Sequence, residues 1–246
     1  MIKLKVIACD VLNREISYLS SQSKCFVDVT FMHQGLHSKP NKMAEILQKE
    51  IDEANKGFPY SHPDRPEDYD YIILMYGLCG NGTIGLSSSK VPLVIPRAHD
   101  CGTLLIGSKE GFKKYHEENA RGFMYSPGWI ERGFQPGAER FDALYKRYEK
   151  KYGSEKAAYL MELEHSFVKE YNSAVLVNWG ILGNEEYYRG VTKISAKYFN
   201  WEYKEVKGSP NLLRNILNGE LNYEEVLILP PKEKIAASFD DYILKY

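Results

Sequence analysis

Short apolar runs recur along the chain, separated by segments of helical pattern or by polar loops. Most of these runs are rich in β-branched residues and nearly continuous in apolar character, which is typical of strands buried on both faces of a parallel sheet. The predicted strands span residues 3–9, 26–32, 70–76, 91–95, 173–178, 200–206 and 224–229. Their alternation with helices predicts a Rossmann-like α/β fold with mainly parallel sheets.

Helical periodicity fills most of the intervals between these strands. A clear case is residues 40–56, for which Ser38 and Pro40 supply the cap and the first turn. Further helices are predicted at residues 103–118, 139–152, 154–171, 184–198 and 210–218. The Pro-rich segment 57–69 is predicted as a loop and the aromatic segment 123–137 as a turn. The block 103–172 has no strand pattern, so we expect it to cover the sheet or cap a site.

The domain organisation has two interpretations. The chain forms either a first α/β lobe at residues 1–102, a helical and lid segment at 103–172 and a second α/β lobe at 173–246, or one compact domain. Both halves contain an extended segment, a helix opened by Ser and Pro, and a following strand. Two similar βαβαβ lobes facing one cleft would produce this similarity between the halves. The usual alternation of strands and helices in an α/β protein would produce it as well.

Composition excludes several classes of partner. The formal net charge of −1 leaves no excess of Lys and Arg for phosphate binding, so we expect no nucleic-acid partner. No segment reaches the roughly 18 apolar residues that span a bilayer, and the first residues have the pattern of a strand rather than a signal peptide. We therefore expect a cytoplasmic protein with no membrane contact. In a reducing compartment, its four cysteines are expected to be thiols or metal ligands rather than disulfides.

The most reactive side chains follow the predicted strands of the first half. Cys9 ends the first strand, His37 comes shortly after the second, Cys79 follows the third, and the segment from His99 to Cys101 follows the fourth. Ligands of open α/β sheets bind beyond the carboxyl ends of the strands, where residues distant in sequence converge. The sequence therefore predicts a metal or ligand site at this edge of the sheet.

Glycines surround Cys79. The turn contains Gly77, Gly80, Asn81 and Gly82, which allow positive φ angles and a close approach of the backbone to a ligand. Exposed N–H groups of such a turn can hold an anion, so these residues and His37 are predicted to contact a cofactor. The spacing matches neither the dinucleotide fingerprint nor the P-loop. The turn is better suited to presenting an accessible thiol.

The segment after the fourth strand adds a second group of candidate ligands. His99 and Cys101 are two residues apart, so that in an extended turn both side chains can reach one ion. Asp100 is predicted to orient an imidazole, and Arg97 to lower a thiol pKa or to hold a substrate carboxylate or phosphate. Both are candidate catalytic residues. With Cys9, the edge would carry three thiols.

Each of these residues also has a purely structural interpretation. Free cysteine is among the most buried residue types, and for Cys25, at the start of a strand, we expect core packing. For Cys9 and His37, a role in the site and a purely structural role both remain open. Trp129, in a Gly-Pro turn, is predicted either to form a lid over a bound ligand or to fill the space between lobes.

Several motifs give the chain a family resemblance. They are IAC (Ile7 to Cys9), GLHSKP (Gly35 to Pro40), YGLCGNG (Tyr76 to Gly82), PRAHDC (Pro96 to Cys101), GSKE (Gly107 to Glu110) and PGWIERG (Pro127 to Gly133). With these motifs the sequence resembles the family catalogued as domain of unknown function 1638, from which it departs at Asp10 and Gly102. The resemblance implies a setting in anaerobic methylotrophic metabolism near corrinoid-dependent methyltransferases, and hence one-carbon chemistry.

Three hypotheses follow for the function. In the first, zinc held by Cys79, His99, Cys101 and Cys9 serves the transfer of a methyl or related group to or from a small-molecule substrate. In the second, Cys9, Cys79 and Cys101 hold a [4Fe–4S] cluster whose open iron acts as a Lewis acid. In the third, the protein is not an enzyme but handles a corrinoid or a metal for a partner methyltransferase or corrinoid protein.

Overall fold

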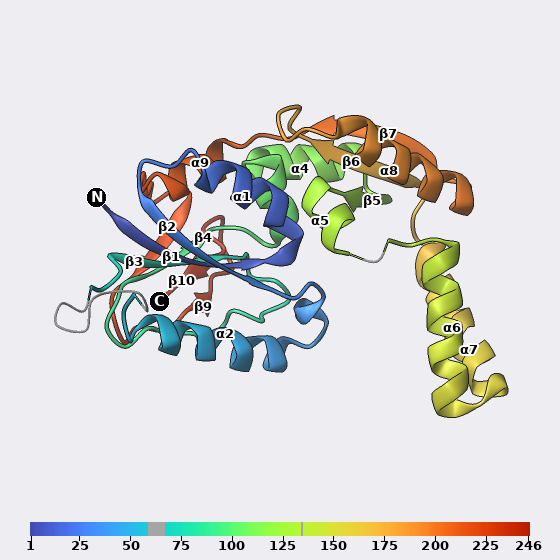
Figure 1. The fold of residues 1–246 in the computed structure, drawn as a ribbon, viewed down its shortest axis with the longest axis horizontal. Coiled ribbons are helices and arrows are strands. Elements are labelled where there is room, and N and C mark those ends of the chain that lie inside the picture. The colour runs from blue at the N-terminus through green and yellow to red at the C-terminus, as the bar shows by residue number, and fades with distance from the viewer. Residues whose placement is uncertain (59–66, 134) are drawn as a thin grey trace. The chain divides into compact units, whose positions relative to one another are not determined.

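The computed structural model describes residues 1–58, 67–133 and 135–246 (Figure 1). Part of the loop predicted at 57–69 and one residue of the turn predicted at 123–137 lie outside these ranges. The chain divides into two compact units, the first formed by Met1–Phe112 and Ser209–Tyr246 and the second by Lys113–Gly208. Both units combine helices with parallel strands, which confirms the predicted α/β, Rossmann-like fold class.

The first unit contains a five-stranded sheet in the order β2-β1-β3-β4-β8. Its strands are β1 (Lys3–Cys9), β2 (Phe26–Met32), β3 (Tyr71–Met75), β4 (Leu93–Pro96) and β8 (Val226–Leu229). The first four are parallel, and β8 pairs antiparallel with β4. Because β2 and β3 lie on opposite sides of β1, the strand order reverses between β1 and β3. Open α/β sheets bind ligands at such a topological switch point.

Helices cover both faces of this sheet (Figure 1). The helices of this unit are α1 (Asn13–Ser20), α2 (Pro40–Ala54), α3 (Cys101–Ile106) and α9 (Asn211–Leu217), with 3₁₀ turns η1 (Asp10–Leu12) and η2 (Leu36–Ser38). The next helix along the chain after α3 is α4 (Lys109–Glu118), whose residues from Lys113 on belong to the second unit. The predicted apolar stripe of α2 is buried: Met43, Leu47 and Ile51 pack in one core cluster with Ile72 and Leu74 of β3. A short antiparallel pair, β9 (Ala236–Ala237) and β10 (Leu244–Lys245), completes the unit.

One predicted helix is divided in two. The sequence pattern indicated a single helix at 103–118, but α3 ends at Ile106 and α4 begins at Lys109. Gly107 between them has a φ of 95°, and a Cβ at this position would lie 2.6 Å from the backbone oxygen of Ser209. Gly107 therefore ends α3 as a left-handed cap, and the contact with Ser209 leaves no room for a side chain there. Apolar periodicity alone does not reveal this stop.

The second unit contains a three-stranded parallel sheet in the order β5-β6-β7. Its elements are β5 (Gly122–Tyr125), α5 (Pro127–Arg132), α6 (Ala138–Tyr152), α7 (Ser154–Val168), β6 (Ser173–Asn178), α8 (Glu185–Phe199) and β7 (Glu202–Lys207). The expectation that residues 103–172 contain no strand was wrong. Strand β5 is only four residues long, starts with glycine and is half-buried along most of its length, so its apolar run is too short to mark a strand.

The similarity between the two halves of the sequence does not correspond to a structural repeat. Its second copy consists of β7, α9 and β8, yet β7 belongs to the sheet of the second unit and β8 to that of the first. Moreover, β8 is antiparallel to its neighbour, whereas a βαβ repeat requires parallel strands. The usual alternation of strands and helices in an α/β protein therefore accounts for the similarity. Within the described ranges, no helix has the length and apolar character needed to cross a membrane.

Candidate functional site

Three of the four cysteines lie at the carboxyl edge of the first sheet. Cys9 is the last residue of β1, Cys79 follows β3, and Cys101 begins α3 after β4. This edge includes the switch point between β1 and β3. Cys25 directly precedes β2, which places it at the opposite, amino edge. All four thiols are free and partly buried.

Backbone pairing holds the Cys79 turn against the segment that leads to Cys101. The N–H of Leu78 donates to the carbonyl of Ala98 at 2.8 Å, and the N–H of Cys79 donates to the carbonyl of His99 at 2.9 Å. Gly77 permits this approach, because a Cβ there would lie 2.6 Å from the Ala98 oxygen. The role of Gly77 is therefore to bring two thiol-bearing segments together.

The turn itself is left-handed over three consecutive residues. The φ angles are 47° at Cys79, 65° at Gly80 and 70° at Asn81. A residue with a Cβ is strained in this region, and such strain clusters at functional sites. Gly82 closes the turn over α2, where an added Cβ would meet the sulfur of Met43 at 2.6 Å. The sequence predicted positive φ for the glycines, but not for Cys79.

The three thiols at this edge are electrostatic neighbours. Burial raises the pKa of Cys9 to about 11 and that of Cys79 to about 12, and it raises the pKa of Cys101 well above its ordinary value. The negative charge of an ionised Cys9 raises the pKa of Cys79 further, and Cys9 and Cys79 together raise that of Cys101. Asp10 acts in the same direction on Cys9, as does Asp100 on the other two thiols. The site therefore favours neutral thiols while no cation is bound.

Tyr76 adds a hydroxyl group that the sequence analysis missed. Its side chain is 3% exposed, and its hydroxyl has no hydrogen-bond partner among the described residues. Burial raises the pKa of Tyr76 first, followed by the charges of Cys9, Cys79 and Cys101. The available signal was a phenol immediately after the apolar run of β3 and directly before the glycine turn.

The other predicted residues of this segment have different surroundings. Asp100 caps α3, since its carboxylate accepts hydrogen bonds from the N–H groups of Gly102 at 2.9 Å and Thr103 at 3.3 Å. The side chain of His99 is exposed. His37 is also exposed, on η2, and its carbonyl oxygen lies 3.7 Å from the Cβ position of Gly80. The loop after β2 thus borders the Cys79 turn through its backbone.

Arg97 is engaged with the C-terminal segment. Its Nε donates to the carbonyl of Tyr223 at 2.9 Å, and its Nη1 donates to the carbonyls of Tyr242 at 3.1 Å and Leu244 at 2.5 Å. The guanidinium also lies over the Tyr242 ring, 4.9 Å from its centroid. Two shallow hollows of about 320 and 260 Å³ adjoin Arg97, and none of the cysteines lines them. These two hollows are therefore separate from the thiol site.

Trp129 belongs to the second unit. It lies on α5 and packs against Phe123 and Tyr125 of β5, with ring centroids 5.3 and 4.9 Å apart. These rings form part of an aromatic core cluster around that sheet. Packing within the second unit accounts for this tryptophan.

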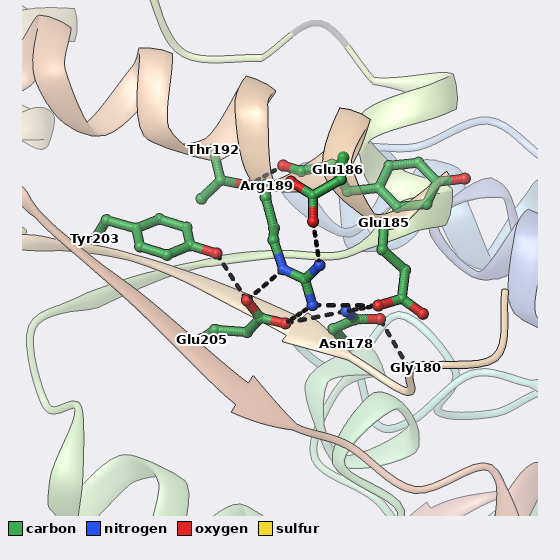
Figure 2. Close-up of polar contacts among 9 residues, drawn as sticks. Asn178, Gly180, Glu185, Glu186, Arg189, Thr192, Tyr203 and Glu205 are labelled. Carbon is green, nitrogen blue, oxygen red and sulfur yellow. Dashed lines mark hydrogen bonds and ion pairs between the residues drawn. The ribbon is translucent and has the colours of Figure 1, made fainter. Parts of the chain in front are cut away.

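A network of charged and polar side chains surrounds Arg189 in the second unit (Figure 2). The Arg189 guanidinium donates to Glu205 at 2.8 Å and to Glu186 at 2.7 Å. The Asn178 amide also donates to Glu205, at 3.0 Å, and accepts from the N–H of Gly180 at 2.9 Å. The hydrogen bond from Arg189 is the main cause that lowers the pKa of Glu205 to about 2. Because these groups satisfy one another, we interpret the cluster as a link between β6, β7 and α8.

The thiol site carries a stronger indication of ligand binding than the Arg189 cluster, but its side chains do not form a preassembled metal site. Across residues 1–58, 67–133 and 135–246, no group of three or more His, Cys, Asp or Glu side chains stands in an arrangement that could hold a metal ion. What the edge does combine is three adjacent thiols, a strained turn and an unsatisfied buried hydroxyl. This combination is suited to a ligand that accepts hydrogen bonds or draws thiolates together.

The comparisons with known proteins point to a family but not to an activity. The family model described as a protein of unknown function (DUF1638) matches residues 31–217. The matched range includes the Cys79 turn, the segment from His99 to Cys101 and the whole of the second unit. No curated protein and no solved structure matches the chain. The match confirms the resemblance that the sequence motifs indicated.

Proposed function

Since the chain belongs to the DUF1638 family, whose description gives no activity, we propose a function from the site itself. Cys9, Cys79 and Cys101 hold a metal centre with one open coordination position, which serves group transfer in one-carbon metabolism. The observation that carries this proposal is that three free thiols neighbour one another at the carboxyl edge of the first sheet, which includes the switch point.

The chemistry of the donors supports the proposal. Each thiol must lose its proton to bind a metal, and a bound cation lowers thiol pKa values that burial and neighbouring charges now raise. To bind one ion the three sulfurs would have to turn toward it, and each could do so about a single side-chain torsion. The strained Cys79 turn would hold its thiol in place for such an ion.

Zinc is the first candidate. Catalytic zinc sites commonly have three protein ligands and a fourth position for water or substrate. In that position zinc would keep a substrate thiol deprotonated at neutral pH, as the acceptor or donor of a methyl or related group. Cys9 suits the third ligand better than His99, because its thiol neighbours the other two whereas the His99 imidazole is exposed. The proposed partners are a small-molecule substrate and a corrinoid protein or methyltransferase that exchanges the group.

A [4Fe–4S] cluster is the second candidate, and a specific observation favours it. Three thiols are mutual neighbours at the edge, and three thiolates can hold such a cluster with one iron open. The open iron would then act as a Lewis acid toward a substrate oxygen. Both candidates use the same three residues, so a single set of variants tests them.

The test is metal analysis with an absorption spectrum on anaerobically purified protein. Colourless protein with about one zinc per chain supports the first candidate, and brown protein that bleaches in air supports the second. Cys79→Ala should lose the metal, whereas Cys25→Ala, which removes the thiol at the opposite edge, should retain it. Wild-type protein that binds neither metal after reconstitution would overturn the proposal. A zinc-loaded protein that transfers no methyl group from methylcobalamin to a thiol would instead favour a corrinoid- or metal-handling accessory role.

A further inference from the structure

We infer that the hydroxyl of Tyr76 donates a hydrogen bond to the metal-bound sulfur of Cys9, and that Tyr76 is a positioning residue of the centre. This inference rests on the proposed function, because it requires a metal at the three thiols. It assigns a role to a buried polar group that otherwise has no partner among the described residues.

The register of the sheet places the two side chains together. Ala8 of β1 is paired with Met75 of β3 in parallel register, so Cys9 and Tyr76 occupy the next position on each chain. Neighbouring residues at the same level of parallel strands project to the same face. Consistent with this, Cys9, Tyr76 and Ile7 belong to the core cluster on the α2 side of the sheet.

The state of the hydroxyl then depends on the state of the sulfur. A buried hydroxyl without a partner is rare in folded proteins and calls for an explanation such as a ligand. A neutral thiol is a weak acceptor, and the Tyr76 hydroxyl makes no hydrogen bond among the described residues. A metal-bound thiolate is an anion, and anions accept short, strong hydrogen bonds. Metal binding therefore creates the acceptor that Tyr76 lacks.

A hydrogen bond from Tyr76 should change the metal affinity of the centre in a definite direction. It stabilises the negative charge on the Cys9 sulfur, so it should strengthen retention of the metal and lower the energy of the sulfur lone pairs. Loss of a partner that hydrogen-bonds to a metal ligand typically lowers metal affinity by about 10- to 100-fold. We expect a change of this size on removal of the hydroxyl.

The experiment compares Tyr76→Phe with wild type and with Tyr125→Phe, which removes the hydroxyl of a buried tyrosine in the second unit. Zinc affinity is measured by chelator competition, and the thiolate-to-cobalt charge-transfer band is recorded after loading with Co²⁺. In Tyr76→Phe, zinc should bind about 10- to 100-fold more weakly and the band should move to longer wavelength. Tyr125→Phe should match wild type. If the protein holds an iron–sulfur cluster instead, its reduction potential should fall in Tyr76→Phe only.

The outcomes separate the two proposals. Metal binding by wild type with equal affinity and an identical band in Tyr76→Phe would overturn this inference and leave the metal centre intact. Wild type that binds no metal would overturn both. Misfolding is checked on the metal-free proteins, where Tyr76→Phe should unfold at a temperature equal to or above that of wild type, because it removes an unsatisfied buried hydroxyl.

Discussion

Replacing Gly77 by alanine should test how the two thiol-bearing segments are held together. The new Cβ would lie 2.6 Å from the Ala98 oxygen, 2.8 Å from the Asp100 nitrogen and 2.9 Å from the His99 carbonyl carbon. All three are backbone atoms, so no flexible side chain can move aside. Overpacking costs about 1–3 kcal/mol, and loss of one of the two hydrogen bonds between the segments adds about 1 kcal/mol. We expect the first unit to lose about 2–4 kcal/mol of its free energy of unfolding.

The chain offers a way to measure the two units separately. Its three tryptophans, Trp129, Trp179 and Trp201, all lie in the second unit, so that tryptophan fluorescence reports on this unit alone while circular dichroism reports on both. With a urea dependence of about 2 kcal/mol per molar, Gly77→Ala should lower the dichroism midpoint of the first unit by about 1–2 M. Metal content should fall with it, because Cys79 moves away from Cys101.

The matched control is Gly190→Ala in α8, where an added Cβ meets nothing within 4 Å. Alanine in a helix is more stable than glycine by about 1 kcal/mol, so the fluorescence midpoint should rise. Gly77→Ala should therefore lower the free energy of unfolding, whereas Gly190→Ala should raise it. A Gly77→Ala protein with the dichroism midpoint and metal content of wild type would refute the close packing of the Cys79 turn against the Ala98–Asp100 backbone.

Three further results are expected. Cys79→Gly should be more stable than Cys79→Ala by about 1 kcal/mol in paired urea titrations, because a φ of 47° strains any residue with a Cβ; equal midpoints would contradict the left-handed turn. Arg97→Ala should speed amide hydrogen exchange near Leu244, because it removes a hydrogen bond to the Leu244 carbonyl, while metal content should stay at the wild-type level. Loss of metal from this variant would instead indicate that Arg97 contributes to the metal site. Metal-free protein should lose stability as pH rises from about 9, because folding raises the pKa of Cys9 from 9.0 to about 11 and that of Cys79 to about 12, so the native state keeps protons that the unfolded chain releases. Urea midpoints at pH 8 and pH 10.5 measure this loss, which should be smaller in Cys79→Ala.

The parts of the fold that local pattern specifies could be predicted. Buried parallel strands are marked by apolar β-branched runs, and these runs located β1 to β4 and β6 within one or two residues. The shared edge of the thiols follows from this, because the carboxyl ends of neighbouring parallel strands lie together. Strand β5 could not be found in the same way, since it has only four residues and begins with Gly122, which leaves too short an apolar run.

Features that depend on distant partners could not be predicted. The guanidinium of Arg97 bonds to carbonyl groups 126 to 147 residues further along the chain, and no local signal reveals those acceptors. Asp100 is a different case. An aspartate directly before a helical segment is a common cap signal, so its hydrogen bonds to the start of α3 were available from sequence, yet its position beside His99 favoured a role at a metal.

Tyr76 shows why register matters more than proximity in sequence for a site of this kind. Along the chain, its hydroxyl stands between an aliphatic strand and a glycine turn, and nothing nearby explains it. Only the pairing of β1 with β3 places it level with Cys9, 67 residues earlier in the sequence. A one-residue shift of that pairing would send Cys9 and Tyr76 to opposite faces of the sheet. The same apolar contacts that fix the register of the first sheet therefore also determine which polar groups meet at its edge.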